Sequence, residues 1–188
     1  MADDPSNPNL PINLQGLLLL ADPSLREGIF HRSVILLAEH KSDEGAYGLI
    51  LNHPTGKTVG DFLKGDEFAS LRHLSVYEGG PVAQEQLTFS SFWWSKQRGL
   101  RWAIRISAED AVVHARRPGR IVRAFVGYSG WSAGQLENEL RRNSWIAIRP
   151  QPGLLGHDHD VSLWASLLSP ISPLHRILAA APYDPSLN

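Results

Sequence analysis

Three apolar runs of strand length, at about residues 14–20, 33–39 and 47–51, set the strongest constraint on how this chain can fold. Each run is rich in Leu, Ile or Val, and short runs of this kind are typical of buried β-strands. The sequence Ser-Asp-Glu-Gly at residues 42–45 favours a chain reversal between the second and third runs. These two runs are therefore predicted to pair as an antiparallel hairpin with a loop longer than two residues, which the first run can join.

The rest of the chain alternates further strands with short helices. Strand patterns recur after a tight turn predicted at Gly79-Gly80-Pro81, at residues 86–92, 100–106 and 120–126. Capping residues or a following proline indicate short helices at about 61–63, 108–114, 135–142 and 164–168. The predicted fold class is α/β of the α+β kind, a compact and mixed β-rich sheet core flanked by short helices.

The chain length of 188 residues favours one domain. Residues 1–12 contain three prolines and few apolar residues, so we predict a flexible leader there and a single domain over residues 13–188. The sequence contains no cysteine, which excludes disulfides, thiolate nucleophiles and cysteine-based metal centres. This composition is compatible with a reducing compartment.

The amino-terminal sequence argues against export. The first 25 residues hold three aspartates and neither Lys nor Arg, whereas a secretory signal needs positive charge ahead of its apolar run. The longest uncharged apolar stretch, residues 10–21, is shorter than the roughly 18 residues of a membrane span. The sequence therefore predicts a cytoplasmic protein with no membrane contact.

Charge is distributed unevenly along the chain. The formal net charge is −1, yet residues 96–149 carry 11 basic and 4 acidic groups. Arg forms bidentate contacts with phosphate, so this block is a candidate nucleic-acid footprint, although solvated surface arginines are a simpler explanation. Aromatic residues beside the block could stack on bases or contact a protein. The candidate ligand- or partner-binding residues are Arg116, Arg117, Arg120, Trp93, Trp94, Tyr128 and Trp131.

The segment Gly127-Tyr128-Ser129-Gly130-Trp131 resembles the nucleophile turn of a hydrolase. That turn has the pattern G-x-S-x-G, whereas here the fifth position is Trp131. We interpret the segment as a strand-to-helix turn in which the two glycines allow unusual backbone angles. A hydrolase with Ser129 as nucleophile remains the alternative, and no catalytic residue is assigned.

The tetrad His157-Asp158-His159-Asp160 has the donors of a metal site. Alternating imidazoles on an extended segment could point to the same side, so a site at His157 and His159 belongs to the hydrolase alternative. The tetrad also precedes the helix at Trp164, where Asp is a favoured N-cap. Capping is the preferred interpretation, and neither a metal nor another cofactor is predicted.

Three signatures in order resemble the AlgH/YqgE family of uncharacterised bacterial proteins. They are Phe30–His40 with Gly45–Pro54, then Tyr77–Val82, then Gly127–Glu137 with Asn143–Trp145. The resemblance implies a cytosolic α/β protein with a β-rich core, no settled enzymatic activity and no agreed catalytic residues. The AlgH name reflects a proposed regulatory role.

Together, these observations predict a non-enzymatic binding or regulatory module, a transcriptional regulator acting directly or through a protein partner. They leave open whether the protein is an enzyme, although they favour a protein without enzymatic activity. The expected partner is nucleic acid or an unidentified protein. The sequence leaves the oligomeric state open.

Overall fold

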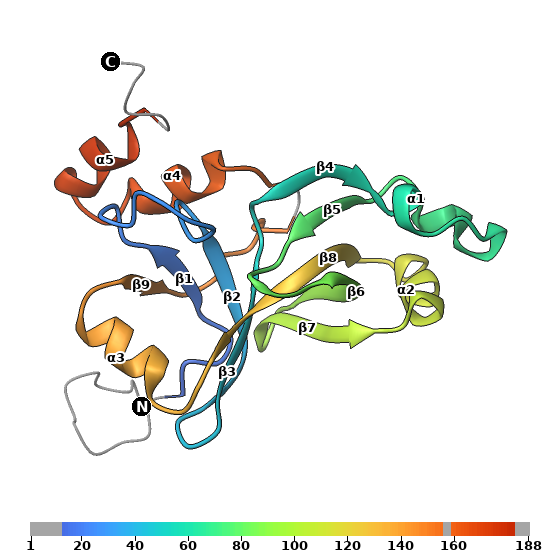
Figure 1. Cartoon of the computed structure of the whole chain (residues 1–188), viewed down its shortest axis with the longest axis horizontal. Coiled ribbons are helices and arrows are strands. Elements are labelled where there is room, and N and C mark those ends of the chain that lie inside the picture. The colour runs from blue at the N-terminus through green and yellow to red at the C-terminus, as the bar shows by residue number, and fades with distance from the viewer. Residues whose placement is uncertain (1–12, 156–158, 183–188) are drawn as a thin grey trace.

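The computed structural model describes residues 13–155 and 159–182. The predicted leader at residues 1–12 lies outside this range. The described residues form a nine-stranded mixed sheet with short helices around it, so the predicted α+β class is confirmed (Figure 1). The strands are β1 (Leu18–Ala21), β2 (Val34–Lys41), β3 (Gly45–Ile50), β4 (Pro54–Thr58), β5 (Ser75–Glu78), β6 (Val82–Ser95), β7 (Gly99–Ile106), β8 (Arg120–Trp131) and β9 (Trp145–Ile148).

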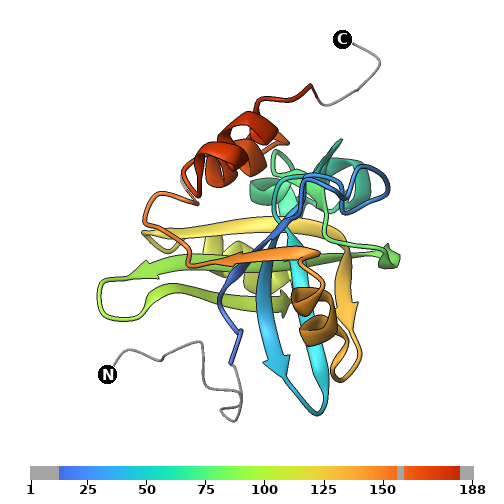
Figure 2. The same cartoon turned by 90° about the vertical axis from the view of Figure 1, so that its left-hand side faces the viewer.

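The long strand β8 joins the two parts of the sheet. The main order is β4-β5-β8-β3-β2-β1-β9, and β6 pairs with both β8 and β7 beside this path. The pair β5 and β8 is parallel, and the other described pairs are antiparallel. The predicted hairpin is confirmed as β2 and β3, and β1 pairs with β2 on its other side. The turn between β6 and β7 protrudes at the left of Figure 2.

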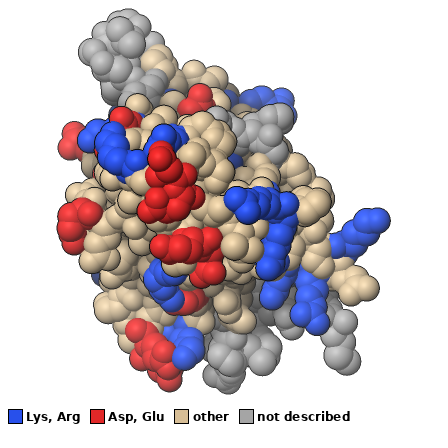
Figure 3. All heavy atoms as spheres, turned by 90° about the vertical axis from the view of Figure 1, so that its right-hand side faces the viewer, with Lys and Arg blue, Asp and Glu red and all other residues tan. Residues whose placement is uncertain are grey.

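Helices cover both ends of the sheet. They are α1 (Val59–Phe62), η1 (Asp66–Leu71), α2 (Ala108–Ala115), α3 (Gln135–Arg141), α4 (Ser162–Leu168) and α5 (Pro173–Ala179). Helices α1, η1 and α2 lie on the right of Figure 1, the side that faces the viewer in Figure 3. The capping signals behave as predicted: Thr58 and Asp61 form a capping box at α1, and the Ser107 side chain accepts a hydrogen bond from the Asp110 amide at α2.

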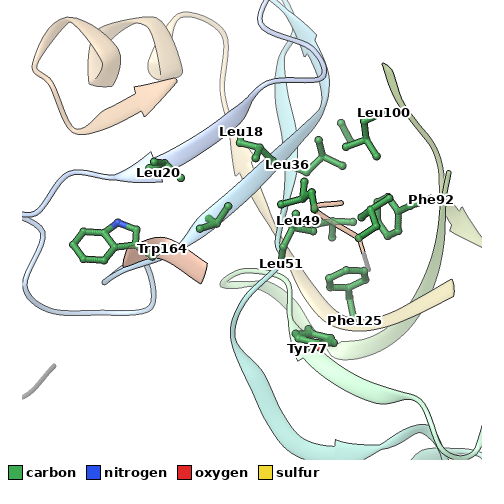
Figure 4. Packing of buried hydrophobic residues seen from close by; sticks show 14 of the residues in the cluster. Leu18, Leu20, Leu36, Leu49, Leu51, Tyr77, Phe92, Leu100, Phe125 and Trp164 are labelled. Carbon is green, nitrogen blue, oxygen red and sulfur yellow. The ribbon is translucent and has the colours of Figure 1, made fainter. Parts of the chain in front are cut away.

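The largest apolar cluster lies where the sheet curls on itself. Leu36 and Leu49 of the hairpin pack in one cluster with Phe92 of β6 and Phe125 of β8 (Figure 4). Helix α4 extends this cluster with Trp164, whose indole Nε1 donates to the Ala21 carbonyl over 2.8 Å. The predicted helix at 164–168 is thus confirmed, and its hydrogen-bonded indole attaches the carboxyl-terminal helices to β1.

The segment Gly127–Trp131 is part of β8, so the predicted strand-to-helix turn there is wrong. The segment continues the strand because Gly130 and Ser129 pair with β3. Its glycine at 127 is needed for a close crossing with Gly80, since a Cβ on Gly127 would lie 2.3 Å from the Gly80 carbonyl oxygen. The crossing brings the three family signatures together, because the Gly79 carbonyl accepts hydrogen bonds from the Ile50 amide and the Ser129 hydroxyl.

Candidate nucleic-acid interface

A row of Arg, Trp and Arg crosses three neighbouring strands. Trp93 of β6 is opposite Arg101 of β7 on one side and Arg120 of β8 on the other. Residues directly opposite each other in antiparallel strands point to the same face of the sheet. The same registers place Phe92 opposite Trp102 and Ile121, and these residues point to the other face, toward the main core. Strand pairing therefore aligns three residues that are far apart in sequence.

Arg120 and Trp93 form a close cation–π pair. The guanidinium carbon of Arg120 lies 3.9 Å from the centre of the Trp93 ring, well within the 6 Å range of this interaction. Arg120 Nη1 also lies 3.3 Å from Nδ1 of His114, at the end of α2. Desolvation lowers the pKa of His114, and Arg120 and Arg117 lower it further against a smaller opposing effect of Asp110. Two contacts thus hold the Arg120 guanidinium in place.

Further basic residues surround this row. We use the name basic tip for the two adjoining segments 93–101 and 114–120, which contain no Asp or Glu. The exposed charges of the basic tip are Lys96, Arg98, Arg101, Arg116 and Arg117, with Arg120 partly buried among them. In Figure 3, a group of Lys and Arg with few acidic residues near it lies at the right of the visible face, whereas toward its left Lys and Arg are interspersed with Asp and Glu. The basic tip thus contains six cations, of which Arg101 and Arg120 lie directly beside Trp93.

Trp94 is the residue of β6 that follows Trp93, and its side chain points to the opposite face of the strand. It is opposite Leu100 in the register of β6 and β7 and is 38% exposed. The sequence predicts that strand alternation would send the two rings to different sides, and the register confirms this. Trp94 therefore extends the candidate surface around the end of the turn.

Two other candidates, Tyr128 and Trp131, lie toward the opposite end of β8 and are not brought to the basic tip. The Trp131 side chain is 6% exposed, and its Nε1 donates to Glu139 Oε2 over 2.9 Å. The Tyr128 ring stacks on Tyr47, with 4.8 Å between centres. Neither ring belongs to the surface that holds Trp93.

Arg123, part of the basic block in the sequence, does not reach the basic tip. It is 5% exposed and its Nη1 donates to the Leu51 carbonyl over 3.3 Å and to His159 Nδ1 over 2.8 Å. The His159 amide in turn donates to the Tyr77 hydroxyl. His157 and Asp158 lie outside the described residues. Asp160 accepts a hydrogen bond from the Ser162 amide at the first turn of α4, consistent with the predicted capping interpretation.

The surroundings of Ser129 do not support the hydrolase alternative. This residue is fully buried and its hydroxyl donates to the Gly79 carbonyl over 3.1 Å. A nucleophile must reach a substrate and a base, and this hydroxyl is instead part of the strand crossing. Within residues 13–155 and 159–182, no group of three His, Asp or Glu is placed to hold a metal ion. None of the helices in these ranges is long and apolar enough to cross a membrane.

The sequence is similar to those of a known protein family. The model of the AlgH-like family matches residues 18–173, most of the chain. The chain belongs to the AlgH-like family. A UPF0301 protein of Streptomyces coelicolor is 32% identical to this AlgH-like protein over 94% of this chain and 96% of its own length. A UPF0301 protein of Bacteroides thetaiotaomicron is 30% identical over 93% and 91%, respectively.

Solved structures agree with the family assignment. The solution structure of the AlgH protein from Pseudomonas aeruginosa matches this AlgH-like protein with a TM-score of 0.63 and 25% identity, over 96% of this chain and 99% of that one. A crystal structure from Corynebacterium diphtheriae matches with a TM-score of 0.67 at 19% identity, over 89% and 92%. The second match shows the shared fold.

Proposed function

We propose that this AlgH-like protein is a non-enzymatic regulatory module that binds nucleic acid directly through the basic tip. The observation that carries the proposal is the Arg120 guanidinium held 3.9 Å from the Trp93 ring, in the row with Arg101. The proposal takes residues 13–188 as one module, acting as a transcriptional regulator in the cytoplasm, where bacterial nucleic acid is accessible.

The chemistry of the basic tip suits a phosphate backbone. Arg guanidinium groups bind phosphate through paired donors, and cations gathered on two adjoining segments can contact successive phosphates. Neutralising these phosphates releases counterions and supplies affinity that does not depend on sequence. Trp93 adds a ring beside the phosphate-binding groups, as in proteins that stack unpaired bases. The expected ligand is therefore double-stranded or single-stranded nucleic acid bound with little sequence preference.

The test is a binding titration of mixed-sequence DNA and RNA duplexes, and of a single strand, across a salt series. We expect about micromolar affinity at low salt, with a steep fall as salt rises. In the variant with Arg116, Arg117 and Arg120 all changed to Ala, the slope for duplex DNA should decrease by about 2 to 3, because each lost phosphate contact contributes about 0.9.

The matched control removes three exposed arginines elsewhere: Arg141, Arg142 and Arg149, all changed to Ala. Arg120 begins β8, whereas these three residues come after the other end of that strand. The control therefore changes the net charge by the same amount as the first variant without altering the basic tip. Equal losses of nucleic-acid affinity in the two triple variants would mean that only the net charge of the protein matters. That result would contradict the proposal. Absence of binding at low salt would leave the indirect form, with a protein partner at the exposed Trp94, as the alternative.

A further inference from the structure

A small hollow lies in the sheet away from the basic tip, where β3 and β6 approach the same stretch of β8. Its volume is about 170 Å³. Its lining residues are Tyr47, Ala83, Gln86, Thr88, Arg105, Gly127 and Tyr128. Arg105 is the one charged residue among them. A hollow with a single cation, two phenol rings and neutral polar groups has the composition of a site for a small anion.

Two irregularities in strand register lie beside this hollow. The register of β6 with β8 shifts between Val82 and Leu87, opposite Gly127, and the register of β6 with β7 shifts between Phe89 and Ser91, opposite the stretch of β7 that holds Arg105. A bulge bends its strand and redirects a side chain. The two irregular strands therefore leave the sheet open at this point and turn residues toward it.

Backbone strain is concentrated at the same place. Ala83 has φ +51° and Arg105 has φ +53°, which are left-handed values rarely adopted by residues other than glycine. Two of the four such non-glycine residues in the described structure line this one hollow. Strained conformations tend to cluster at ligand sites, where the surrounding structure holds a side chain in a required orientation.

Arg105 is directed onto the Tyr47 ring. Its guanidinium carbon lies 4.6 Å from the centre of the Tyr47 ring, which stacks on Tyr128. Arg105 Nη2 also lies 2.6 Å from Glu39 Oε1, with both side chains about half exposed at 49% and 50%. An exposed ion pair of this kind contributes little free energy, so an incoming anion can share or replace the Glu39 contact at small cost.

We propose that this hollow binds a small organic anion, with the carboxylate or phosphate group of the ligand on Arg105 and its planar body along the Tyr47 and Tyr128 rings. A planar guanidinium makes two parallel hydrogen bonds to either group, so both ligand types share one chemistry. The site uses none of the residues of the basic tip. Its test can therefore fail while nucleic-acid binding stands, and the reverse is also true.

The experiment titrates the protein with benzoate and with phenyl phosphate, using benzyl alcohol as the uncharged probe, and follows amide and ring signals by NMR. We expect binding in the millimolar range, as for a ligand of about nine heavy atoms, with signal changes at Tyr47, Thr88 and Tyr128. Stronger binding of benzoate would identify the natural ligand as a carboxylate, and stronger binding of phenyl phosphate as a phosphate ester. Equal binding of benzyl alcohol would overturn the proposal.

Two variants separate binding from folding. Arg105→Gly removes the guanidinium and suits the left-handed backbone, so the protein should stay folded while affinity for the anion falls at least tenfold. Glu39→Gln removes the competing carboxylate and should tighten binding several-fold. The matched control is Arg142→Ala, at an exposed position outside both the hollow and the basic tip, which should leave anion affinity unchanged. Unchanged affinity in Arg105→Gly, or equal losses in Arg105→Gly and Arg142→Ala, would contradict the assignment.

Discussion

Arg120 and Arg123 lie three positions apart on β8, yet they have opposite surroundings. An odd spacing on a strand sends two side chains to opposite faces. Arg120 lies on the face with Trp93 and reaches the surface, whereas Arg123 is buried and donates to the Leu51 carbonyl and to His159. One basic block in the sequence therefore supplies both surface charge and an internal contact.

At the scale of a single residue, the pKa of His114 should respond to a ligand bound at the basic tip. Desolvation, Arg120 and Arg117 hold it below the ordinary value in the free protein. Bound phosphates would offset the two arginine charges, so we expect the pKa of His114 to rise on binding. Binding then takes up protons, and affinity for DNA should increase as pH falls through the ordinary histidine range.

The measurement is an NMR titration of the histidine ring signals with and without a DNA oligonucleotide. The exposed His73 of the turn before β5 serves as the control and should respond less. An unchanged His114 pKa in the presence of saturating DNA would argue that the ligand contacts another surface.

At the scale of the secondary-structure elements, β8 crosses the Gly79–Gly80 segment at very close range. The two chains approach so closely that a Cβ on Gly80 would lie 2.2 Å from the Tyr128 carbonyl carbon. The same crossing provides hydrogen bonds from the Gly79 amide to the Val126 carbonyl and from the Ile50 amide to the Gly79 carbonyl. It therefore connects β3, β5 and β8 at the centre of the sheet.

Two glycines with nearly the same backbone angle test this constraint. Gly127 has φ +70° and Gly119 has φ +73°, but only at Gly127 would a Cβ meet other atoms within 4 Å. We expect Gly119→Ala to cost about 1 kcal/mol from conformation alone. Gly127→Ala should cost more than about 4 kcal/mol or prevent folding, because the crossing chains must separate.

Urea unfolding of both variants and of the unchanged protein gives the comparison. A similar loss of unfolding free energy in Gly127→Ala and Gly119→Ala would mean that the crossing relaxes easily. The backbone angle alone would then explain the glycine at position 127.

At the scale of the whole molecule, we expect the partly buried His53 to make the stability of the fold sensitive to acid. His53 Nε2 is buried and makes no hydrogen bond in the described part of the structure. Burial lowers the pKa of His53, the main-chain groups of Arg32 and His31 oppose this lowering, and the charge of His31 adds a smaller lowering. Burial and the nearby Arg32 also lower the pKa of His31.

These shifts predict that stability falls as pH decreases. The unfolded chain titrates its histidines at about pH 6.5 and therefore binds more protons than the folded protein below that value. The stabilisation from a neutral His53 is complete above about pH 6.5 and is lost as pH falls, with a slope of at most about 1.4 kcal/mol per pH unit for one proton.

Urea midpoints measured from pH 7.5 to pH 5 test this expectation. His53→Gln cannot take up the proton, so its midpoint should fall less steeply with acid than that of the unchanged protein. An identical pH dependence in both proteins would place the acid-sensitive group elsewhere.

Local features of this AlgH-like protein were determined by the sequence alone. The β2–β3 hairpin, the caps of α1 and α2 and the helix at Trp164 depend on residues within a few positions of one another, and all were predicted. Strands β4, β5 and β9 and helices η1 and α5 were missed because they are short or carry weak periodicity. The glycines at 127 and 130 suggested a turn, whereas pairing with β3 keeps Ser129 and Gly130 in a strand.

Only the tertiary structure decided which residues share a surface. The arginines and Trp93 were recognised as candidates in the sequence, but their alignment in one row depends on the registers of β6, β7 and β8. The hollow around Arg105 depends on two bulges and a chain crossing, which leave no local pattern in the sequence. The physical reason is range: caps and turns form between near neighbours, whereas strand register and close crossings are set by packing between distant segments.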